Sequence, residues 1–336
     1  MSVAGFNNPT SADPPGYWRD FPDITEKDDA RISRFRASDG CNLVVYEFGR
    51  EANDAVVIVN PLSTPFLLLA GLVGELAKRY RVVSWETRGG PFLGEDASTG
   101  SVSLDRQARD FMEIVEDKGL DGFHAVSLCS GAPIIARAAS GTGVPIRSIS
   151  LNAPSGAGTA DTRTQYQDVF APMILEAGTS DTAEARRNAQ VMQDYVQARH
   201  VDDGLKDQVS RLTYLNLRDL DSITGFARVM SDYWSLDVGE RHAEFDEMCG
   251  RHPVMVMHAM DDPTVHYSAS LKACLRTGLP KLVLHPTGGH FKLSERGSEA
   301  MRDVMAFMAA HDRPDLDWPA LTPGLYLGPI VQPDWL

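Results

Sequence analysis

The spacing of hydrophobic positions changes several times along the chain, and these changes predict its secondary structure. Hydrophobic and polar residues alternate over 33–37 and 42–48, on either side of a Ser-Asp-Gly sequence that is typical of a hairpin turn. Residues 55–59, Ala-Val-Val-Ile-Val, form a continuous β-branched run instead. Such a run is typical of a strand buried on both faces of a parallel sheet.

From this strand onward, strand-like and helix-like segments alternate. Further strands are expected at 81–85, 123–128, 146–151, 253–257 and 281–284, with 281–284 as the last strand of the chain. Helices are expected at 66–79, 104–118, 132–139, 267–277 and 295–310. This alternation predicts an α/β fold, with a mostly parallel sheet and helices on both of its faces.

The alternation stops between residues 154 and 245, where the sequence is polar, helix-prone and without an obvious strand. A stretch of about 90 residues is too long for a connecting loop in a compact sheet. We therefore expect 154–245 to form a helical lid, inserted into a core made of 31–153 and 246–311. Residues 1–30 are predicted to form an irregular arm, and 312–336 an extended tail.

The composition excludes several classes of function. The chain has 336 residues, of which 43% are hydrophobic and 23% charged, as in an ordinary globular protein. Its net charge of −14 argues against nucleic acid or an anionic membrane as a partner, because both require basic surface. The N-terminus does not resemble a signal peptide, and no apolar run reaches the ~20 residues that span a bilayer. A cytoplasmic protein is expected, with its oligomeric state left open.

The four cysteines, Cys41, Cys129, Cys249 and Cys274, form no C-x-x-C pair and show no regular spacing. Neither a zinc site nor a disulfide framework is indicated, so free thiols are expected. No motif in the chain indicates a metal ion or an organic cofactor.

One cysteine occupies a position that suggests chemistry. Cys129 lies directly after the predicted strand 123–128 and before a predicted helix, with Ser127 and Gly131 two positions away on either side. A sharp strand-to-helix turn presents its central residue as a nucleophile and tolerates only small residues at these two positions. Ser130 is a poorer candidate because Leu128 is bulky, and Ser127 as nucleophile would leave Gly131 unexplained. Most free cysteines are simply buried, but this position favours a catalytic thiol.

Two later loops carry the partners that such a thiol needs. The predicted strand 253–257 runs into Asp261 and Asp262, and an acid there can orient a histidine. Asp262 has the better position, with Asp261 in reserve, although Asp-Asp-Pro is also ordinary turn sequence. His290 follows two glycines after the strand 281–284 and is the expected general base. His258 and His285 are the alternatives at the same edge of the sheet.

The order nucleophile, acid, histidine resembles the α/β-hydrolase superfamily over most of residues 33–311. Asn60, Pro61 and Leu62 stand where many members have His-Gly. This resemblance implies an oxyanion hole formed by the backbone N–H groups of Leu62 and Ser130.

The chain departs from the usual pattern of this superfamily at three places. Cys129 replaces the usual serine, Ser127 replaces the glycine two positions before it, and Ala259 replaces the glycine before the acid. The chain is most similar to thioesterase-like members of natural-product pathways. Since a thiolate exchanges one thioester for another at little cost, we expect acyl transfer through a Cys129 acyl-enzyme. The donor would be a small-molecule acyl group linked to coenzyme A or a carrier protein, and the acceptor another nucleophile or water.

Three residues are candidates for contact with the substrate. Glu86 ends a predicted strand beside Arg88, Trp234 belongs to a helically spaced aromatic stripe in the predicted lid, and Phe291 follows His290. The alternatives are a salt bridge for the first pair and ordinary packing for the stripe. Two other functions also fit the sequence: a carboxylester or lactone hydrolase with a Cys-His-Asp triad, and a non-catalytic ligand-binding protein on a hydrolase fold.

Overall fold

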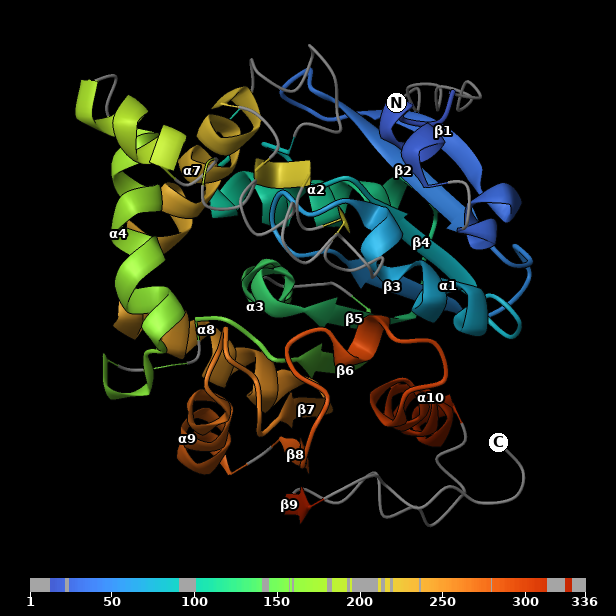
Figure 1. Ribbon diagram of the computed structural model, residues 1–336. Coiled ribbons are helices and arrows are strands. Elements are labelled where there is room, and N and C mark those ends of the chain that lie inside the picture. Colours follow the sequence, from blue (N-terminus) through green and yellow to red (C-terminus); the bar gives the residue numbers. More distant parts are fainter. Residues whose placement is uncertain are drawn as a thin grey trace, which may run out of the picture.

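The computed structural model describes residues 13–21, 24–90, 101–140, 145–156, 158, 160–179, 183–191, 194, 211–212, 215–217, 220–235, 237–278, 280–312 and 324–327. In this part of the chain a 9-stranded sheet has the order β1-β2-β4-β3-β5-β6-β7-β8-β9 (Figure 1). The strands are β1 Arg31–Arg36, β2 Asn42–Phe48, β3 Ala55–Val59, β4 Arg81–Trp85, β5 Phe123–Leu128, β6 Ile146–Asn152, β7 Val254–Ala259, β8 Lys281–His285 and β9 Gly324–Leu327.

The sheet is parallel except at one edge. β1 and β2 form the predicted antiparallel hairpin, and β2 also pairs antiparallel with β4. The strands from β4 to β9 run parallel to one another. The predicted α/β fold class is therefore confirmed. All residues of β3 and β5 are buried, as the continuous apolar run of β3 indicates.

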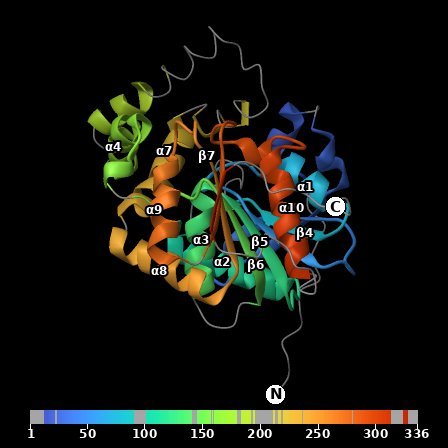
Figure 2. The same cartoon turned by 90° about the horizontal axis from the view of Figure 1, so that it is seen from below.

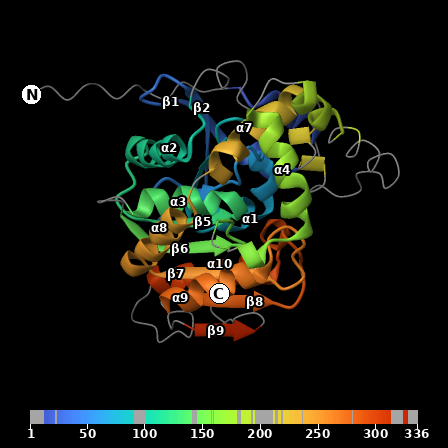
Figure 3. The same ribbon diagram turned by 90° about the vertical axis from the view of Figure 1, so that its left-hand side faces the viewer.

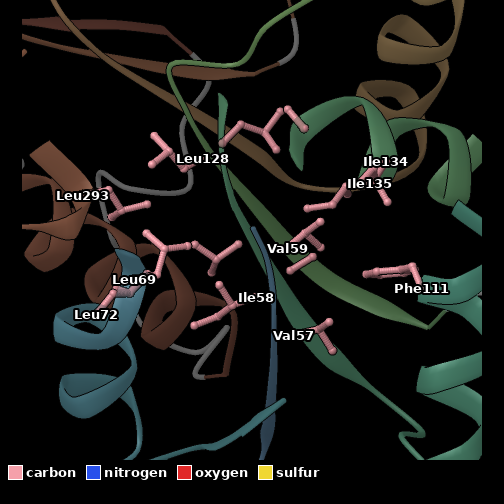
Figure 4. Packing of buried hydrophobic residues seen from close by; sticks show 14 of the residues in the cluster. Val57, Ile58, Val59, Leu69, Leu72, Phe111, Leu128, Ile134, Ile135 and Leu293 are labelled. Carbon is pink, nitrogen blue, oxygen red and sulfur yellow. The ribbon is translucent and has the colours of Figure 1, made fainter. Parts of the chain in front are cut away.

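Helices cover both faces of this sheet (Figure 2). One layer contains α1 Ala70–Leu76 and α10 Glu299–Asp312, and the other contains α2 Leu104–Asp117, α3 Ala132–Ser140, α8 Val238–Arg251 and α9 Tyr267–Thr277. Figure 4 shows the two halves of the core, with Leu72 and Leu293 on one side of the strands and Phe111 and Ile135 on the other. The core thus holds the loops at the strand ends on a rigid support.

The prediction that 281–284 is the last strand is wrong. β9 lies in the C-terminal tail and pairs parallel with β8, from Lys281 opposite Gly324 to Leu284 opposite Leu327. The remainder of the predicted extended tail lies outside the described residues, except for Asp312 at the end of α10.

The predicted irregular arm contains helical structure that contributes to the core. Two 3₁₀ helices, Gly16–Asp20 and Thr25–Asp29, cross the edge of the molecule near β2 and α1. Tyr17 and Trp18 are buried, and the Trp18 ring stacks on Tyr46 with 5.3 Å between the ring centroids. The sequence did not predict this packing, because it depends on a few aromatic side chains within a mostly polar segment.

The segment between β6 and β7 contains the helices α4 Gln165–Thr179 and α7 Leu220–Ser235, followed by α8. We call residues 153–253 the insertion. Figure 3 shows α4 and α7 beyond the carboxyl ends of the strands, whereas α8 packs against α3 in the helical layer of the core. The predicted lid boundary at residue 245 therefore falls inside α8. In the described part of the chain, no helix is long and apolar enough to cross a membrane.

Candidate active site

The turn after β5 holds Cys129 in a strained conformation. Its φ of 51° lies in the left-handed region, which non-glycine residues rarely adopt, at a cost of about 1–2 kcal/mol. The short 3₁₀ turn Cys129–Gly131 leads directly into α3, so the chain reverses sharply between strand and helix. Backbone strain at this position is typical of a nucleophile that is exposed at a sharp turn between a strand and a helix.

Small neighbours make this turn possible. A Cβ atom on Gly131 would lie 2.5 Å from the carbonyl oxygen of Val59 and 3.2 Å from the Cβ of Ser127. A larger residue at either position would therefore push the turn away from β3. The serine at 127 is fully buried, which places its side chain in the packing of the turn.

The four cysteines of the chain differ in accessibility. Cys41, Cys249 and Cys274 are buried, whereas Cys129 is partly exposed. Burial raises the pKa of Cys274 to about 12 and also raises that of Cys249. Those two thiols remain protonated at neutral pH, so Cys129 is the accessible candidate for nucleophilic chemistry.

The loop after β8 brings His290 next to Asp262, with 2.7 Å between Nδ1 and the carboxylate Oδ2. The other carboxylate oxygen, Oδ1, accepts the backbone N–H groups of Thr264 and Val265 at 2.7 and 3.0 Å. Burial alone would raise the pKa of Asp262, but hydrogen bonds from His258 and His290 hold it well below its usual range. The carboxylate of Asp262 is therefore ionised, and its orientation is fixed by these hydrogen bonds.

Asp261 has a different place. Its two carboxylate oxygens accept the backbone N–H groups of Gly288 and Gly289, at 3.2 and 2.8 Å. Both glycines have positive φ values, of 127° and 60°, which favour glycine. The two adjacent acids therefore have different roles: Asp261 fixes the Gly288–Gly289 loop, and Asp262 orients the ring of His290.

The ring of His290 lies between this acid and the thiol. Burial of the ring opposes protonation, but the charge of Cys129 and the hydrogen bonds with Asp262 and Cys129 raise the pKa of His290 above its ordinary value. Because Nδ1 faces Asp262, Nε2 is the ring nitrogen left for the sulfur. The arrangement favours the protonated form of the His290 ring beside the sulfur.

The alternative histidines lie elsewhere. His285 faces α10, with Nε2 3.2 Å from Asp303. His258 contacts the site from behind, because its Nε2 lies 3.2 Å from Asp262 Oδ2 and 2.8 Å from the carbonyl oxygen of Val265. A carbonyl oxygen can only accept, so Nε2 of His258 carries a proton and donates. Sequence reasoning saw this histidine only as a substitute base and missed its support of the acid.

One of the two predicted oxyanion-hole donors already has a hydrogen-bond acceptor within the protein. The backbone N–H of Leu62 donates to the side-chain oxygen of Ser130, at 2.9 Å. Ser63, which follows, has a φ of 56°, so the loop after β3 is strained as well. A substrate oxygen would have to displace the Ser130 hydroxyl to reach the Leu62 N–H. An oxyanion is the stronger acceptor, which makes this exchange favourable.

Glu86 does not lie where the sequence led us to expect. Its carboxylate is fully buried and accepts the hydroxyls of Tyr17 and Tyr46 at 2.5 and 2.8 Å, and the backbone N–H of Phe66 at 3.1 Å. These contacts brace the segment after the Leu62 loop, and they point to a structural role in place of the predicted contact with substrate. Arg88 is paired with Asp110 at 2.5 Å.

The other two substrate candidates lie nearer the site. The ring of Phe291 packs edge-on against His290, with 4.9 Å between the centroids. Trp234, on α7, lines a cavity of about 460 Å³ between the helices α4, α7 and α8 and the loops after β6 and β7. We call this space the insertion cavity. Among the described residues, no group of three or more His, Cys, Asp and Glu side chains is placed to hold a metal ion.

Comparison with solved structures gives the fold a name. The chain is similar to a bacterial membrane phospholipase A, at 15% identity and a TM-score of 0.65 over 86% of this chain and 90% of that one. It is also similar to an esterase from Rhodococcus sp., at 16% identity and a TM-score of 0.62 over 83% and 98%. An enol-lactonase from Burkholderia xenovorans matches at 15% identity and a TM-score of 0.60 over 82% and 99%.

These similarities show that the chain has the α/β-hydrolase fold, as the resemblance in its sequence implied. No protein-family model and no curated protein matches the sequence. At identities this low the fold alone is established, and function has to be argued from the site.

Proposed function

We propose that this protein is an acyl-transferring enzyme that accepts an acyl group from a thioester onto Cys129. One observation carries the proposal: a partly exposed thiol at a strained strand-to-helix turn interacts with a histidine whose other nitrogen is held by a buried carboxylate. Thiol, imidazole and carboxylate in this order form a Cys-His-Asp triad.

In the first step the Cys129 thiolate attacks the thioester carbonyl carbon. The carbonyl oxygen becomes an oxyanion, which takes the donors of Leu62 and Ser130 as the Ser130 hydroxyl moves aside. The carbon–sulfur bond to the leaving thiol then breaks, and the leaving sulfur receives the proton of His290. Asp262 stabilises the imidazolium before this transfer but does not take up the proton itself.

In the second step an acceptor attacks the thioester on Cys129. Its proton passes to His290, the bond to the Cys129 sulfur breaks, and the thiolate–imidazolium pair is restored. An alcohol or amine acceptor gives transfer, and water gives hydrolysis. If α4 and α7 act as the predicted lid, they favour transfer by limiting the access of water. The donor thiol would be coenzyme A or a carrier-protein arm.

The choice of a thioester rests on the chemistry of sulfur. A thiolate is a strong nucleophile at neutral pH, and exchange between two thioesters is nearly isoenergetic, whereas forming a thioester from an oxygen ester is uphill. Oxygen-ester hydrolysis is the second candidate, because similar folds include the esterase and the enol-lactonase named above.

Initial rates on a matched pair of substrates test the proposal. Butanoyl-N-acetylcysteamine and ethyl butanoate carry the same acyl group, and each rate is divided by the rate with hydroxide alone. We expect the larger acceleration with the thioester, and loss of that acceleration in Cys129→Ala but not in the matched control Cys274→Ala. A larger acceleration with the oxygen ester would favour the second candidate, and activity that survives Cys129→Ala would contradict both.

A further inference from the structure

The insertion cavity borders the triad at two points. Ser155 lines it, and the Ser155 backbone N–H donates to the carbonyl oxygen of Cys129 at 3.2 Å. Val265 also lines it, and the Val265 backbone N–H donates to Asp262 at 3.0 Å. A group bound in this cavity therefore lies beside the nucleophile and the acid, where the acyl chain of a substrate belongs.

Tyr233 forms the inner wall of the cavity. Its side chain is buried, and its hydroxyl lies 3.0 Å from the Ser155 side-chain oxygen. Burial raises the pKa of Tyr233 above its ordinary value, and the charge of Cys129 adds to this rise, whereas the charge of Arg241 and hydrogen bonds with Ser155 and Arg241 oppose it. The phenol remains protonated and can donate a hydrogen bond.

Arg241 brings a positive charge to this wall that has no carboxylate partner among the described residues. Its guanidinium carbon lies 5.4 Å from the centroid of the Tyr233 ring. Its Nε is buried without a hydrogen-bond partner, and no carboxylate of the described residues lies within ion-pair distance of it. A buried donor without a partner is costly, so a ligand that accepts from it would be stabilised.

The acids nearest to Arg241 along α8 are already engaged. Glu240 and Glu244 pair with Arg137 on α3, at 2.8 and 2.6 Å. The second arginine of the cavity, Arg163, is paired with Asp168 at 2.7 Å. Among the arginines that line the cavity, Arg241 is therefore the one without a carboxylate partner in the described part of the chain.

We propose that the insertion cavity binds an acyl chain that ends in a carboxylate, and that Arg241 recognises this carboxylate. The hydroxyls of Tyr233 and Ser155 provide further donors, and Trp234, Leu175 and Ala269 line the space for the methylene chain. One guanidinium without a carboxylate partner matches one monovalent group, which favours a carboxylate over a phosphate. This inference rests on the proposed acyl transfer and specifies its substrate class as half-esters and half-thioesters of dicarboxylic acids.

Calorimetric binding tests the recognition without requiring turnover. Monomethyl adipate and dimethyl adipate have the same chain and differ by one carboxylate. We expect wild type to bind the monoester about tenfold or more tightly than the diester, as charged hydrogen bonds allow. Arg241→Gln should remove this preference and Arg241→Lys should keep part of it. The control Arg251→Gln, on the same helix but outside the cavity lining, should keep all of it. Equal binding of the two esters, absence of monoester binding, or a preference that survives Arg241→Gln would overturn the inference.

Acylation of Cys129 by the corresponding thioesters separates the inference from the proposed function. Adducts that form equally with adipoyl and hexanoyl thioesters would refute carboxylate recognition and leave acyl transfer intact. Selective binding of the monoester without any adduct on Cys129 would refute acyl transfer and leave recognition by Arg241 intact.

Discussion

Two buried carboxylates at the same edge of the sheet have opposite chemistry. Glu86 follows β4 and is surrounded by two phenols, and burial raises its pKa to about 7 despite their hydrogen bonds. Asp262 follows β7 and is surrounded by two imidazoles and two backbone N–H groups, which hold its pKa well below its usual range against burial. Both acids follow the carboxyl end of a strand, so the difference in their pKa values comes from the groups that surround each of them.

This difference separates structural support from chemistry. A carboxylate that is costly to ionise cannot serve as a reliable anion at neutral pH, but its hydrogen bonds can join the N-terminal arm to the sheet. A carboxylate that remains ionised can orient and stabilise an imidazolium. The two regions can be tested against each other by matched substitutions.

The largest expected effect is on catalysis. Asp262→Asn removes the charge that stabilises the His290 cation, so acylation of Cys129 should slow by about 10³-fold. Glu86→Gln is the matched control, and it should retain acylation within about tenfold. Stopped-flow measurement of the acylation rate, under conditions in which both variants are folded, checks the pair. Similar losses in the two variants would break the distinction between them.

The next effect is on stability. A carboxyl group whose pKa rises on folding binds its proton more tightly in the folded state. The contribution of Glu86 is therefore full below its ordinary pKa of 4.5 and falls as the pH rises to about 7. The unfolding free energy of wild type relative to Glu86→Gln should decline by about 2–3 kcal/mol between pH 5 and pH 8 in urea titrations.

Glu47 provides the control for that decline. Its pKa is lowered by the hydrogen bonds of Arg81 and Lys118, which outweigh the opposing effect of burial. The contribution of Glu47 is present above its ordinary pKa of 4.5, so wild type relative to Glu47→Gln should show no change over the same range. If the difference in unfolding free energy between wild type and Glu86→Gln also stays constant from pH 5 to pH 8, the pKa of Glu86 is not raised by folding.

A smaller effect is expected from His258, which we regard as a positioning residue. His258→Leu removes a donor from Asp262, so the pKa of Asp262 should rise and acylation should slow by about tenfold. The acid limb of the pH–rate profile should move to higher pH, which lost packing alone would not cause. His258→Gln keeps a nitrogen donor and should restore most of the rate. An unchanged acid limb in His258→Leu would assign this histidine to packing only.

The smallest effect belongs to the arm. Tyr17→Phe removes the 2.5 Å hydrogen bond to Glu86, and the unfolding free energy should fall by about 1–2 kcal/mol. The rate of Cys129 acylation should remain unchanged, because Tyr17 contacts Glu86 and not the thiol. Thermal unfolding and the acylation rate of the same preparation check this, and a parallel loss of rate would show that the arm shapes the site.

Much of the fold could be predicted because β3 is a continuous β-branched run and because strand-like and helix-like segments alternate after it. β9 was missed because four residues, Gly324–Leu327, in a proline-rich tail carry no such run and depend on β8 for their pairing. Trp18 and Tyr17 were missed for the same reason, since their partners are far away in sequence.

The site was partly predictable. Cys129, Asp262 and His290 each occupy a loop after a strand, and the structure brings the acid and the histidine together at 2.7 Å. The sequence ranked Asp262 above Asp261 but left both open, because the two acids differ in contacts with distant loops: Asp261 holds the glycine loop, and Asp262 holds His290. The hydrogen bond between Leu62 and the Ser130 hydroxyl and the lack of a carboxylate partner for Arg241 depend on contacts between distant segments, which no local pattern reveals.

The central claim is that the sulfur of Cys129 carries the acyl group. Mass spectrometry of the intact protein after exposure to a mixture of acyl thioesters, followed by peptide mapping, tests it most directly. We expect one acyl adduct, located on the peptide that contains Cys129 and absent from Cys129→Ala. An adduct on any other residue, or one that persists in Cys129→Ala, would contradict it.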